Sequence, residues 1–509
     1  MVNNVDNNNR IAKNTLFLYF RMVLVLIVGL YTSRVVLNAL GSSDFGLYNV
    51  IAGFVTLFSF LNVGLSSSLQ RYYNYEGGRN GDLGYKKVFT AGLCVHVCMA
   101  FILLLVLESF GLWYVNNVLV LPEGRLPAAN ILFQFSVLSL ALVIIQVPYS
   151  GAVIAYERLD FYALVSIVEV VLRLLLVILL PILPFDKLIF YASIQLFISI
   201  LNFIIYVIYT KAKFKFLHFT KPIDYRLLKS MVSFSGWNLI GTLAFLLKSH
   251  GVNLLLNLFF GTVVNAARGV ASQISGSIMG FSNNISMSFR PQIVGSYAVG
   301  DTKRTYKLFL TQSKICYCFI LMLITPVIIE MDYLLYIWLG DAVPEYTNVF
   351  ASLVLIDAMI NTLNTPVTQV VYATGKIKNY QIFSALVNLL ILPFCWLFLK
   401  IGFDAWTVFI ITIVFSIICQ IVCLIILHDV FRFSYIDYIS HIVFPCISMS
   451  VLVPAPLFFF SQFYPDSFMR LVIISISSLL FTILFLYSFF LSFSERKLID
   501  YYFSKLFKR

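Results

Sequence analysis

The sequence predicts an all-α integral membrane protein of about 14 transmembrane helices, built as two parallel-repeat lobes of six helices plus two C-terminal helices. Composition is the first observation, because 60% of the 509 residues are hydrophobic and only 11% are charged. A soluble domain carries about 25% charged residues, so this chain could not cover a surface that faces water. The apolar runs are about 20 residues long without strict alternation, which suits helices and argues against a β-barrel. A repeated polar motif is the third observation.

Helices are expected wherever an apolar run is long enough to cross a hydrocarbon core of about 30 Å. Turn signals separate several runs, as in GSSD at 41–44, PILPF at 181–185 and YPDS at 464–467. The polar N-terminus lacks the pattern of a cleaved signal, so the first run is expected to remain as a spanning helix. The expected spans are 15–38, 44–68, 88–112, 128–150, 162–182, 187–210, 231–258, 263–288, 307–329, 346–372, 380–399, 405–427, 436–461 and 469–491.

The basic residues orient these helices. With the N-terminus in the cytoplasm, 25 of the 35 Lys and Arg residues fall in cytoplasmic segments, four fall on the opposite side and six lie within spans. Cytoplasmic loops of membrane proteins carry such an excess, so the net charge of +12 reflects topology and does not indicate a nucleic-acid partner. We therefore expect a multi-pass protein of the bacterial cytoplasmic (inner) membrane with both termini in the cytoplasm.

A polar motif of 12 residues occurs twice, as RYYNYEGGRNGD at 71–82 and RPQIVGSYAVGD at 290–301. Arg, Gly and Asp match at its first, eleventh and twelfth positions, with a constant offset of 219. The copies follow the second and eighth expected helices, so six helices separate them and both halves have the same orientation. Such parallel repeats are a known transporter architecture. The alternative is that both segments are ordinary basic loops.

This repeat divides the chain into four regions. The expected regions are an N-lobe of six helices at 1–210, a cytoplasmic linker at 211–230, a C-lobe of six helices at 231–427, and helices 13 and 14 with a basic tail at 428–509.

Several segments resemble the MOP superfamily, which contains MATE exporters and lipid II and polysaccharide flippases. The likeness is clearest to the Wzx-type O-antigen flippases. Four segments carry it: NTLFLYFRMVLVLIVGLYTSRVVLNALGSSDFGLYNVIAG, SFSGWNLIG, NAARGVASQI and FRPQIVGSYAVGD.

The resemblance implies two lobes in a V around a central cavity. It also implies a substrate, an oligosaccharide on polyprenyl diphosphate, that moves from the cytoplasmic to the outer leaflet during lipopolysaccharide or other cell-surface polysaccharide biosynthesis. Its implied partners are this lipid-linked oligosaccharide, membrane lipids, and the polymerase and glycosyltransferases of the same pathway.

Charged side chains inside the expected spans are candidates for the binding site. Each costs roughly 2.5–3.5 kcal/mol at mid-bilayer, so such groups usually face a cavity or a partner. Basic residues outnumber acids there, and guanidinium groups suit the oxygen atoms of a diphosphate or an acidic glycan. The sequence therefore predicts a cationic substrate-binding site made of Arg21, Arg34, Arg173, Lys248 and Arg268.

Several of these residues have a second interpretation. Arg34 lies near a helix end and can extend to the interface. Glu169 and Arg173 are four residues apart, so they can form a structural pair or act in transport. Asp357 can pair with Lys248, and Asp357 and Glu169 are the two candidates for coupling to a proton or a sodium ion.

An ion-coupled MATE-like exporter of small molecules is the main alternative function. A site for cationic drugs should be lined by acids, which the basic bias disfavours. A membrane enzyme needs a catalytic platform, and the longest expected outer loops, of about 15–17 residues, contain no catalytic motif. We therefore expect no enzymatic activity. Without a Walker motif, ATP is not the direct energy source.

Cofactors and metals are not expected, apart from coupling to H+ or Na+. All eight cysteines lie in apolar runs and are interpreted as small hydrophobic residues. In the cluster Cys94-x-His96-x-Cys98, a helix would turn the imidazole about 200° away from the thiols, so a metal site is not expected there.

Overall fold

The computed structural model describes residues 17–490, apart from 26, 30, 33–34, 37–38, 41–43, 46, 49–50, 56–57, 118, 120–123, 183, 261 and 341–342. Throughout these described residues the secondary structure is helical, without a β-strand, which confirms the expected fold class. The chain forms two compact units, Met1–Leu243 with Val294–Asp301, and Ala244–Ile293 with Thr302–Arg509, here called unit 1 and unit 2. The division falls inside a helix, whereas the expected linker lies at 211–230.

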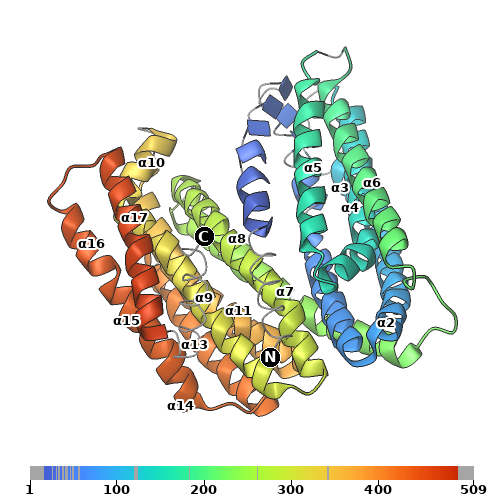
Figure 1. Cartoon of the computed structure of the whole chain (residues 1–509). Coiled ribbons are helices and arrows are strands. Elements are labelled where there is room, and N and C mark those ends of the chain that lie inside the picture. Colours follow the sequence, from blue (N-terminus) through green and yellow to red (C-terminus); the bar gives the residue numbers. More distant parts are fainter. Residues whose placement is uncertain are drawn as a thin grey trace, which may run out of the picture. The chain divides into compact units, whose positions relative to one another are not determined.

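Unit 1 is built around α4 (Leu126–Ala155), which contacts the other long helices of the unit. The long α2 (Ser59–Val106) continues through the π-helical turn η1 (Leu107–Gly111) into the short α3 (Leu112–Asn117). α4 (Leu126–Ala155) packs against both α2 and α6 (Lys187–Lys213), and α5 (Leu159–Ile178) packs on α6 (Figure 1). Buried Leu, Val, Ala and Phe side chains from these helices form a continuous core, in which Phe133 and Ile144 of α4 are fully buried.

Each of the next two helices has residues in both units. α7 (Tyr225–Phe260) begins in unit 1 and ends in unit 2. α8 (Thr262–Ala298) lies in unit 2 except for its last five residues, which belong to unit 1. α8 is rich in Gly, Ser and Asn, so its hydropathy is low, yet it forms an unbroken helix of 37 residues.

Unit 2 repeats the packing of unit 1. α11 (Thr347–Thr374) packs against α9 (Thr302–Ile329) and α13 (Thr407–Val430), and α12 (Lys378–Ile401) packs on α13. In each half, the fourth membrane helix therefore contacts the third and the sixth, and the fifth contacts the sixth. The same order of contacts in both halves is what a parallel repeat of six helices requires.

Both copies of the 12-residue motif form a turn at a glycine with positive φ. Gly81 (φ 58°) kinks α2, and Gly300 (φ 81°) separates α8 from α9. An L side chain is strained in this conformation, which accounts for the matched glycines. The two turns are neighbours within unit 1, because a Cβ atom added to Gly78 would stand 3.1 Å from the Ala298 Cβ. They therefore lie at the same end of the helices, as a repeat in one orientation predicts.

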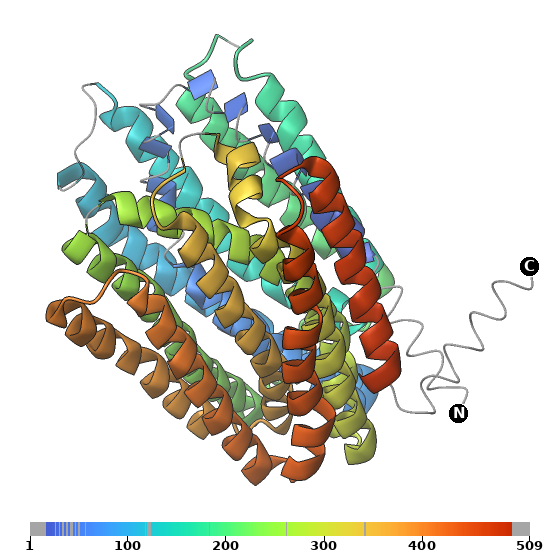
Figure 2. The same cartoon turned by 90° about the vertical axis from the view of Figure 1, so that its left-hand side faces the viewer.

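The C-terminal helices lie against α9. α14 (Tyr435–Tyr438), η2 (Ile439–Val443), α15 (Phe444–Leu452) and α16 (Pro454–Ser461) together form one span, and α17 (Phe468–Phe485) with η3 (Leu486–Phe490) forms the next. α15, α16 and α17 all contact α9 (Figure 2). Lys314 of α9 donates from Nζ to the Phe490 carbonyl at 2.7 Å.

Hydropathy identifies most of these helices as membrane spans. Among the described residues, 11 helical segments are long and apolar enough to cross a membrane. The first of these, Ile51–Asn117, contains two helices around Gly81, and the low-hydropathy α8 and the segment Phe17–Gly29 are further candidates. The chain is therefore a multi-pass membrane protein with about 14 helices, as expected. One segment between expected spans differs from the expectation, because 330–346 is not all loop and contains α10 (Met331–Leu339).

Candidate functional site

One face of α5 presents the polar groups of unit 1. Tyr162, Glu169 and Arg173 are spaced by seven and then four residues, which places them on the same side of a helix. Arg173 donates from Nη2 to Glu169 Oε1 at 2.7 Å. Asn202 of α6 donates from Nδ2 to the other oxygen, Oε2, at 2.8 Å. Both carboxylate oxygen atoms of Glu169 are thus occupied within unit 1.

Arg21 lies beside this polar face and forms no ion pair with another described residue. Its guanidinium carbon stands 4.9 Å from the centre of the Tyr162 ring, at the distance of a cation–π contact. Its Nε is buried and has no hydrogen-bond partner among the described residues. Tyr206 of α6 interacts electrostatically with both Arg21 and Glu169, so these residues share one neighbourhood. Arg173 also has a buried Nε without a partner in the described structure.

In unit 2, two basic residues lie at the same stretch of α7. Arg268 of α8 donates from Nη2 to the Ser249 carbonyl at 2.8 Å, next to Lys248 in the chain. Its other terminal nitrogen, Nη1, is buried and has no partner in the described part of the chain. Both Arg268 and Lys248 interact electrostatically with Cys395 of α12. Neither forms an ion pair with another described residue, so no carboxylate in the described part of the chain neutralises their charge by direct contact.

Asp357 of α11 is an acid that interacts electrostatically with Lys248. Asn361, one turn later, donates from Nδ2 to Asp357 Oδ2 at 3.0 Å. The second oxygen, Oδ1, is buried without a hydrogen-bond partner in the described structure. Lys248 attracts the carboxylate electrostatically but does not form a hydrogen-bonded ion pair with it. The pairing considered from the sequence is therefore an interaction at a distance.

The predicted site residues form two groups. Arg21, Glu169 and Arg173 lie in unit 1, whereas Lys248, Arg268 and Asp357 lie in unit 2, and Arg34 lies outside the described residues. Sequence reasoning missed the polar neighbours Tyr162, Asn202 and Tyr206. For Tyr162 a signal existed, because it precedes Glu169 by two helical turns.

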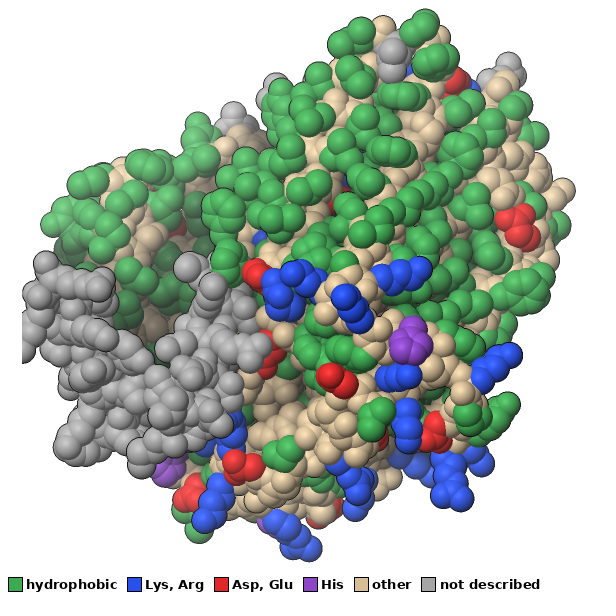
Figure 3. Space-filling model, turned by 45° about the vertical axis from the view of Figure 1, so that its right-hand side comes forward, with side chains coloured by type: hydrophobic (Ala, Val, Ile, Leu, Met, Phe, Trp, Pro, Cys, Tyr) green, Lys and Arg blue, Asp and Glu red, His purple; other side chains and the backbone are tan. Residues whose placement is uncertain are grey.

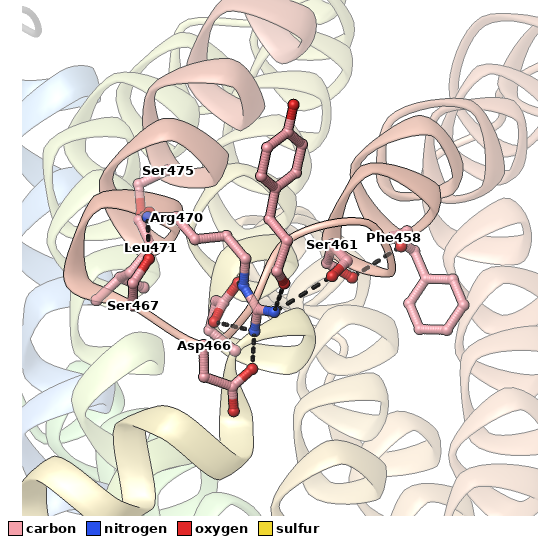
Figure 4. A network of polar contacts seen from close by, with 9 residues as sticks. Phe458, Ser461, Asp466, Ser467, Arg470, Leu471 and Ser475 are labelled. Carbon is pink, nitrogen blue, oxygen red and sulfur yellow. Dashed lines mark hydrogen bonds and ion pairs between the residues drawn. The ribbon is translucent and has the colours of Figure 1, made fainter.

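A different arginine cluster joins the C-terminal helices to α9 and α10 (Figure 4). Arg470 of α17 donates from Nε and Nη2 to Glu330 at 2.7 and 2.8 Å, and the two side chains are 9% and 0% exposed. Nη2 also contacts Asp466 at 2.6 Å. Nη1 donates to the carbonyl groups of Ser461 and Tyr464. All three guanidinium nitrogen atoms are thus occupied, which identifies this cluster as a structural clamp.

Unit 1 has a more exposed counterpart at Arg125. Its guanidinium contacts Asp44 through Nη2 and through Nε at 2.9 Å, and it also contacts Asp186. The hydrogen bond with Asp44 raises the pKa of Arg125. Burial alone would raise the pKa of Asp186, but hydrogen bonds from the Ile189 amide and from Arg125 outweigh it and lower that pKa. Asp186 also caps the N-terminus of α6.

The cysteines and histidine of the Cys94-x-His96-x-Cys98 motif do not converge. His96 donates from Nδ1 to the Gly92 carbonyl one turn earlier, at 2.7 Å, and Cys98 is exposed. Within the described residues, no group of three His, Cys, Asp or Glu side chains could hold a metal ion.

The fold is that of the MATE transporters of the MOP superfamily. An outward-facing multidrug-resistance MATE transporter is 11% identical over 83% of this chain and 97% of its own, with a TM-score of 0.70. A MATE transporter in a bent conformation is 13% identical over 84% and 96%, with the same TM-score. A MOP transporter from Pyrococcus furiosus, described as having a binding pocket of reverse polarity that suggests a different function, is 10% identical over 82% and 95%, with a TM-score of 0.69. No protein-family model and no curated protein sequence matches the chain.

Proposed function

We propose that this protein is a flippase that moves a polyprenyl-diphosphate-linked oligosaccharide across the bacterial cytoplasmic membrane by alternating access, for cell-surface polysaccharide assembly. One observation carries the proposal: two arginines within the spans, Arg21 and Arg268, retain unoccupied hydrogen-bonding capacity in the described structure. Arg21 and Arg268 each have a buried guanidinium nitrogen without a partner in the described structure. A buried donor left unpaired costs about 1–3 kcal/mol, and an anionic ligand removes that cost when it binds.

The chemistry of a guanidinium group favours phosphate and carboxylate oxygen atoms. Its rigid planar fork forms two parallel charge-assisted hydrogen bonds with two oxygens, a fixed geometry that the lysine ammonium does not have. In this proposal Arg21 and Arg268 hold the diphosphate or an acidic sugar during transport, with Lys248 and Arg173 adding positive charge. Arg34 belongs to the same proposed set.

A MATE-like exporter coupled to an ion gradient is the second candidate function. The neighbouring structures are MATE transporters, and this supports it. Asp357 supports it as well, because its buried Oδ1 has no hydrogen-bond partner in the described structure and could accept a proton or contact a sodium ion. The Pyrococcus furiosus transporter connects pocket polarity with function in this fold, so the sign of the charges is the feature that separates the two candidates.

A deletion strain tests the choice between the two functions. If the protein is a flippase, the strain accumulates lipid-linked oligosaccharide on the cytoplasmic side, and the wild-type gene restores export of the glycan. Arg21→Glu and Arg268→Glu should not restore it, although both variants should reach normal membrane levels. Lys187→Glu is the matched control, because Lys187 is exposed at the first turn of α6, where an acid is favourable.

Undiminished glycan export by Arg21→Glu and Arg268→Glu would exclude the proposed site. A strain that exports glycan normally but becomes sensitive to cationic drugs would favour the exporter instead.

A further inference from the structure

The segment 211–229, which covers the end of α6, its connection to α7 and the start of α7, is strongly basic and is here called the basic linker. Asp224 is its only acid, and all of its Lys and Arg side chains are exposed. These are Lys211, Lys213, Lys215, Lys221, Arg226 and Lys229. Figure 3 shows Lys and Arg side chains gathered along one edge of a broad apolar surface, on the side of the molecule that carries α5 and α6.

Aromatic packing fixes the conformation of the basic linker. Phe214 is buried and stacks on Tyr156, with ring centres 4.7 Å apart, and Leu217 is buried close by in the chain. Tyr156 is held in turn by a hydrogen bond of 2.6 Å from its hydroxyl to Asp82. Phe214 and Leu217 of the linker are therefore packed into unit 1, whereas its Lys and Arg side chains are exposed.

The basic linker also rests on α2. The Thr220 amide donates to Thr90 Oγ1 at 3.3 Å. Asp224 lies 3.9 Å from Lys87, so the linker's acid faces a lysine of α2 and not a lysine of its own segment. This contact places Lys87 in the same basic region.

The positive charges of the basic linker are not neutralised by the protein. None of its six Lys and Arg side chains forms an ion pair anywhere in the described structure. Two large apolar side chains are exposed beside them, Phe219 at 45% and Tyr225 at 76%. Exposed cations next to exposed aromatic rings are characteristic of segments that contact the membrane interface, where rings lie among headgroups.

We propose that the basic linker binds anionic phospholipid headgroups of the leaflet beside it, with Lys211, Lys213 and Lys215 on the phosphates and Phe219 and Tyr225 in the interfacial layer. The segment continues directly from two membrane-spanning helices, so headgroups are the anions nearest to it. This site is independent of the proposed transport function. Its role is to hold the end of α6 and the start of α7 at the membrane surface.

Lipid titration of the full-length protein in neutral detergent tests the proposal. The probe is dioctanoyl phosphatidylglycerol, with dioctanoyl phosphatidylcholine as the neutral comparison, and binding is followed by thermophoresis. A lysine near an anionic surface contributes about fivefold in affinity, so K211Q/K213Q/K215Q should weaken phosphatidylglycerol binding by about a hundredfold. Raising the salt concentration should weaken wild-type binding as well, because exposed charges are screened.

A variant with the same loss of charge in unit 2 is the control. Lys303, Lys307 and Lys376 are exposed, and their replacement by glutamine should leave lipid affinity within about twofold of wild type. Size-exclusion profiles and melting temperatures identify variants that fail to fold, and F219S/Y225S then serves as the second test with an expected loss of affinity.

Three results would overturn the proposal. The first is equal phosphatidylglycerol binding by the wild type and the linker variant. The second is an equal loss in the unit 2 control. The third is a linker variant that loses affinity for farnesyl diphosphate alone, which would assign the segment to the transported diphosphate lipid.

Discussion

Arg470 of α17 and Arg268 of α8 both lie in helices, and their surroundings differ completely. Arg470 uses all three guanidinium nitrogen atoms on Glu330, Asp466 and two backbone carbonyl groups. Arg268 uses Nη2 on one carbonyl of α7, and its buried Nη1 has no partner in the described structure. Arg21 of unit 1 resembles Arg268, because its Nε is also buried without a partner there.

This difference distinguishes charged residues that stabilise the fold of a membrane protein from charged residues that are available to bind a ligand. A buried charge whose hydrogen bonds are all made to protein groups is part of the structure. Removing it would leave its charged partner buried and uncompensated. A buried charge with bonds left open is costly unless a ligand completes it. Arg470 therefore belongs to the fold, and Arg21 and Arg268 belong to the proposed site.

The largest effect is expected for Arg470→Met. This change leaves Glu330 as an uncompensated charge in a site where its side chain is fully buried. Breaking a buried pair in this way costs about 3–5 kcal/mol, so the melting temperature of the purified protein should fall strongly. Arg158→Met is the control, because its pair with Asp160 is exposed and worth less than about 1 kcal/mol.

A double replacement sharpens this first prediction. Removing both charges, as in Arg470→Met with Glu330→Gln, should recover part of the lost stability, since the unpaired carboxylate is then absent. Equal melting temperatures for Arg470→Met and Arg158→Met would show that the clamp does not stabilise the fold.

The second prediction concerns an acid with an open hydrogen-bonding position. Asp357→Asn should reduce gradient-driven transport in proteoliposomes about tenfold, because an amide can neither bind a proton nor carry the charge that attracts sodium. The folded protein should lose little stability, since an amide oxygen can still accept the hydrogen bond from Asn361. Imposed proton and sodium gradients measure the effect separately. Unchanged dependence on both gradients would remove Asp357 from the coupling site.

Glu169 is the intermediate case, since its oxygen atoms are occupied but its pair with Arg173 is about one-third exposed. Glu169→Gln removes the ion pair and keeps the bond with Asn202. We expect a loss of stability below about 1 kcal/mol, after allowing for solvent screening, and unchanged transport. A loss of transport at wild-type stability would move Glu169 from the structural class to the site.

The smallest effect is a dependence of stability on pH near Arg125. The pKa of Asp186 is lowered in the folded protein, so the stabilisation by this carboxylate is present above its unfolded value of about 3.9 and is lost as pH falls through the folded pKa. Asp186→Asn should make the melting temperature depend less steeply on pH between about pH 5 and 3. The slope of this dependence near pH 7 should be unchanged. Parallel wild-type and variant curves below pH 4 would contradict this.

Much of the fold could be predicted because its signals are local. Apolar runs fix the helices, and the spacing of Gly81 and Gly300 fixes the repeat, since both adopt a positive φ that favours glycine. The segment 330–346 was harder, because α10 is amphipathic and only nine residues long. α8 was harder for the opposite reason, since its Gly, Ser and Asn content hides a long helix.

The clamp could not be predicted, because Glu330 and Arg470 are 140 positions apart and their contact depends on how α17 packs on α9. In the sequence both lie at ends of expected spans and carry opposite charge, which is compatible with a pair but does not identify it. Composition likewise identified Arg21 and Arg268 as intramembrane cations. Only side-chain geometry separates them from Arg470, by the partners that each nitrogen atom has.

Transport by purified protein tests the central claim most directly. The assay measures movement of a fluorescent polyprenyl-diphosphate oligosaccharide across proteoliposomes for wild type, Arg21→Gln, Arg268→Gln and the exposed control Arg158→Gln. The account predicts at least a tenfold loss for the first two variants, melting temperatures within about 2 °C of wild type, and normal transport by the control. Normal transport by Arg21→Gln and Arg268→Gln at unchanged stability would contradict it.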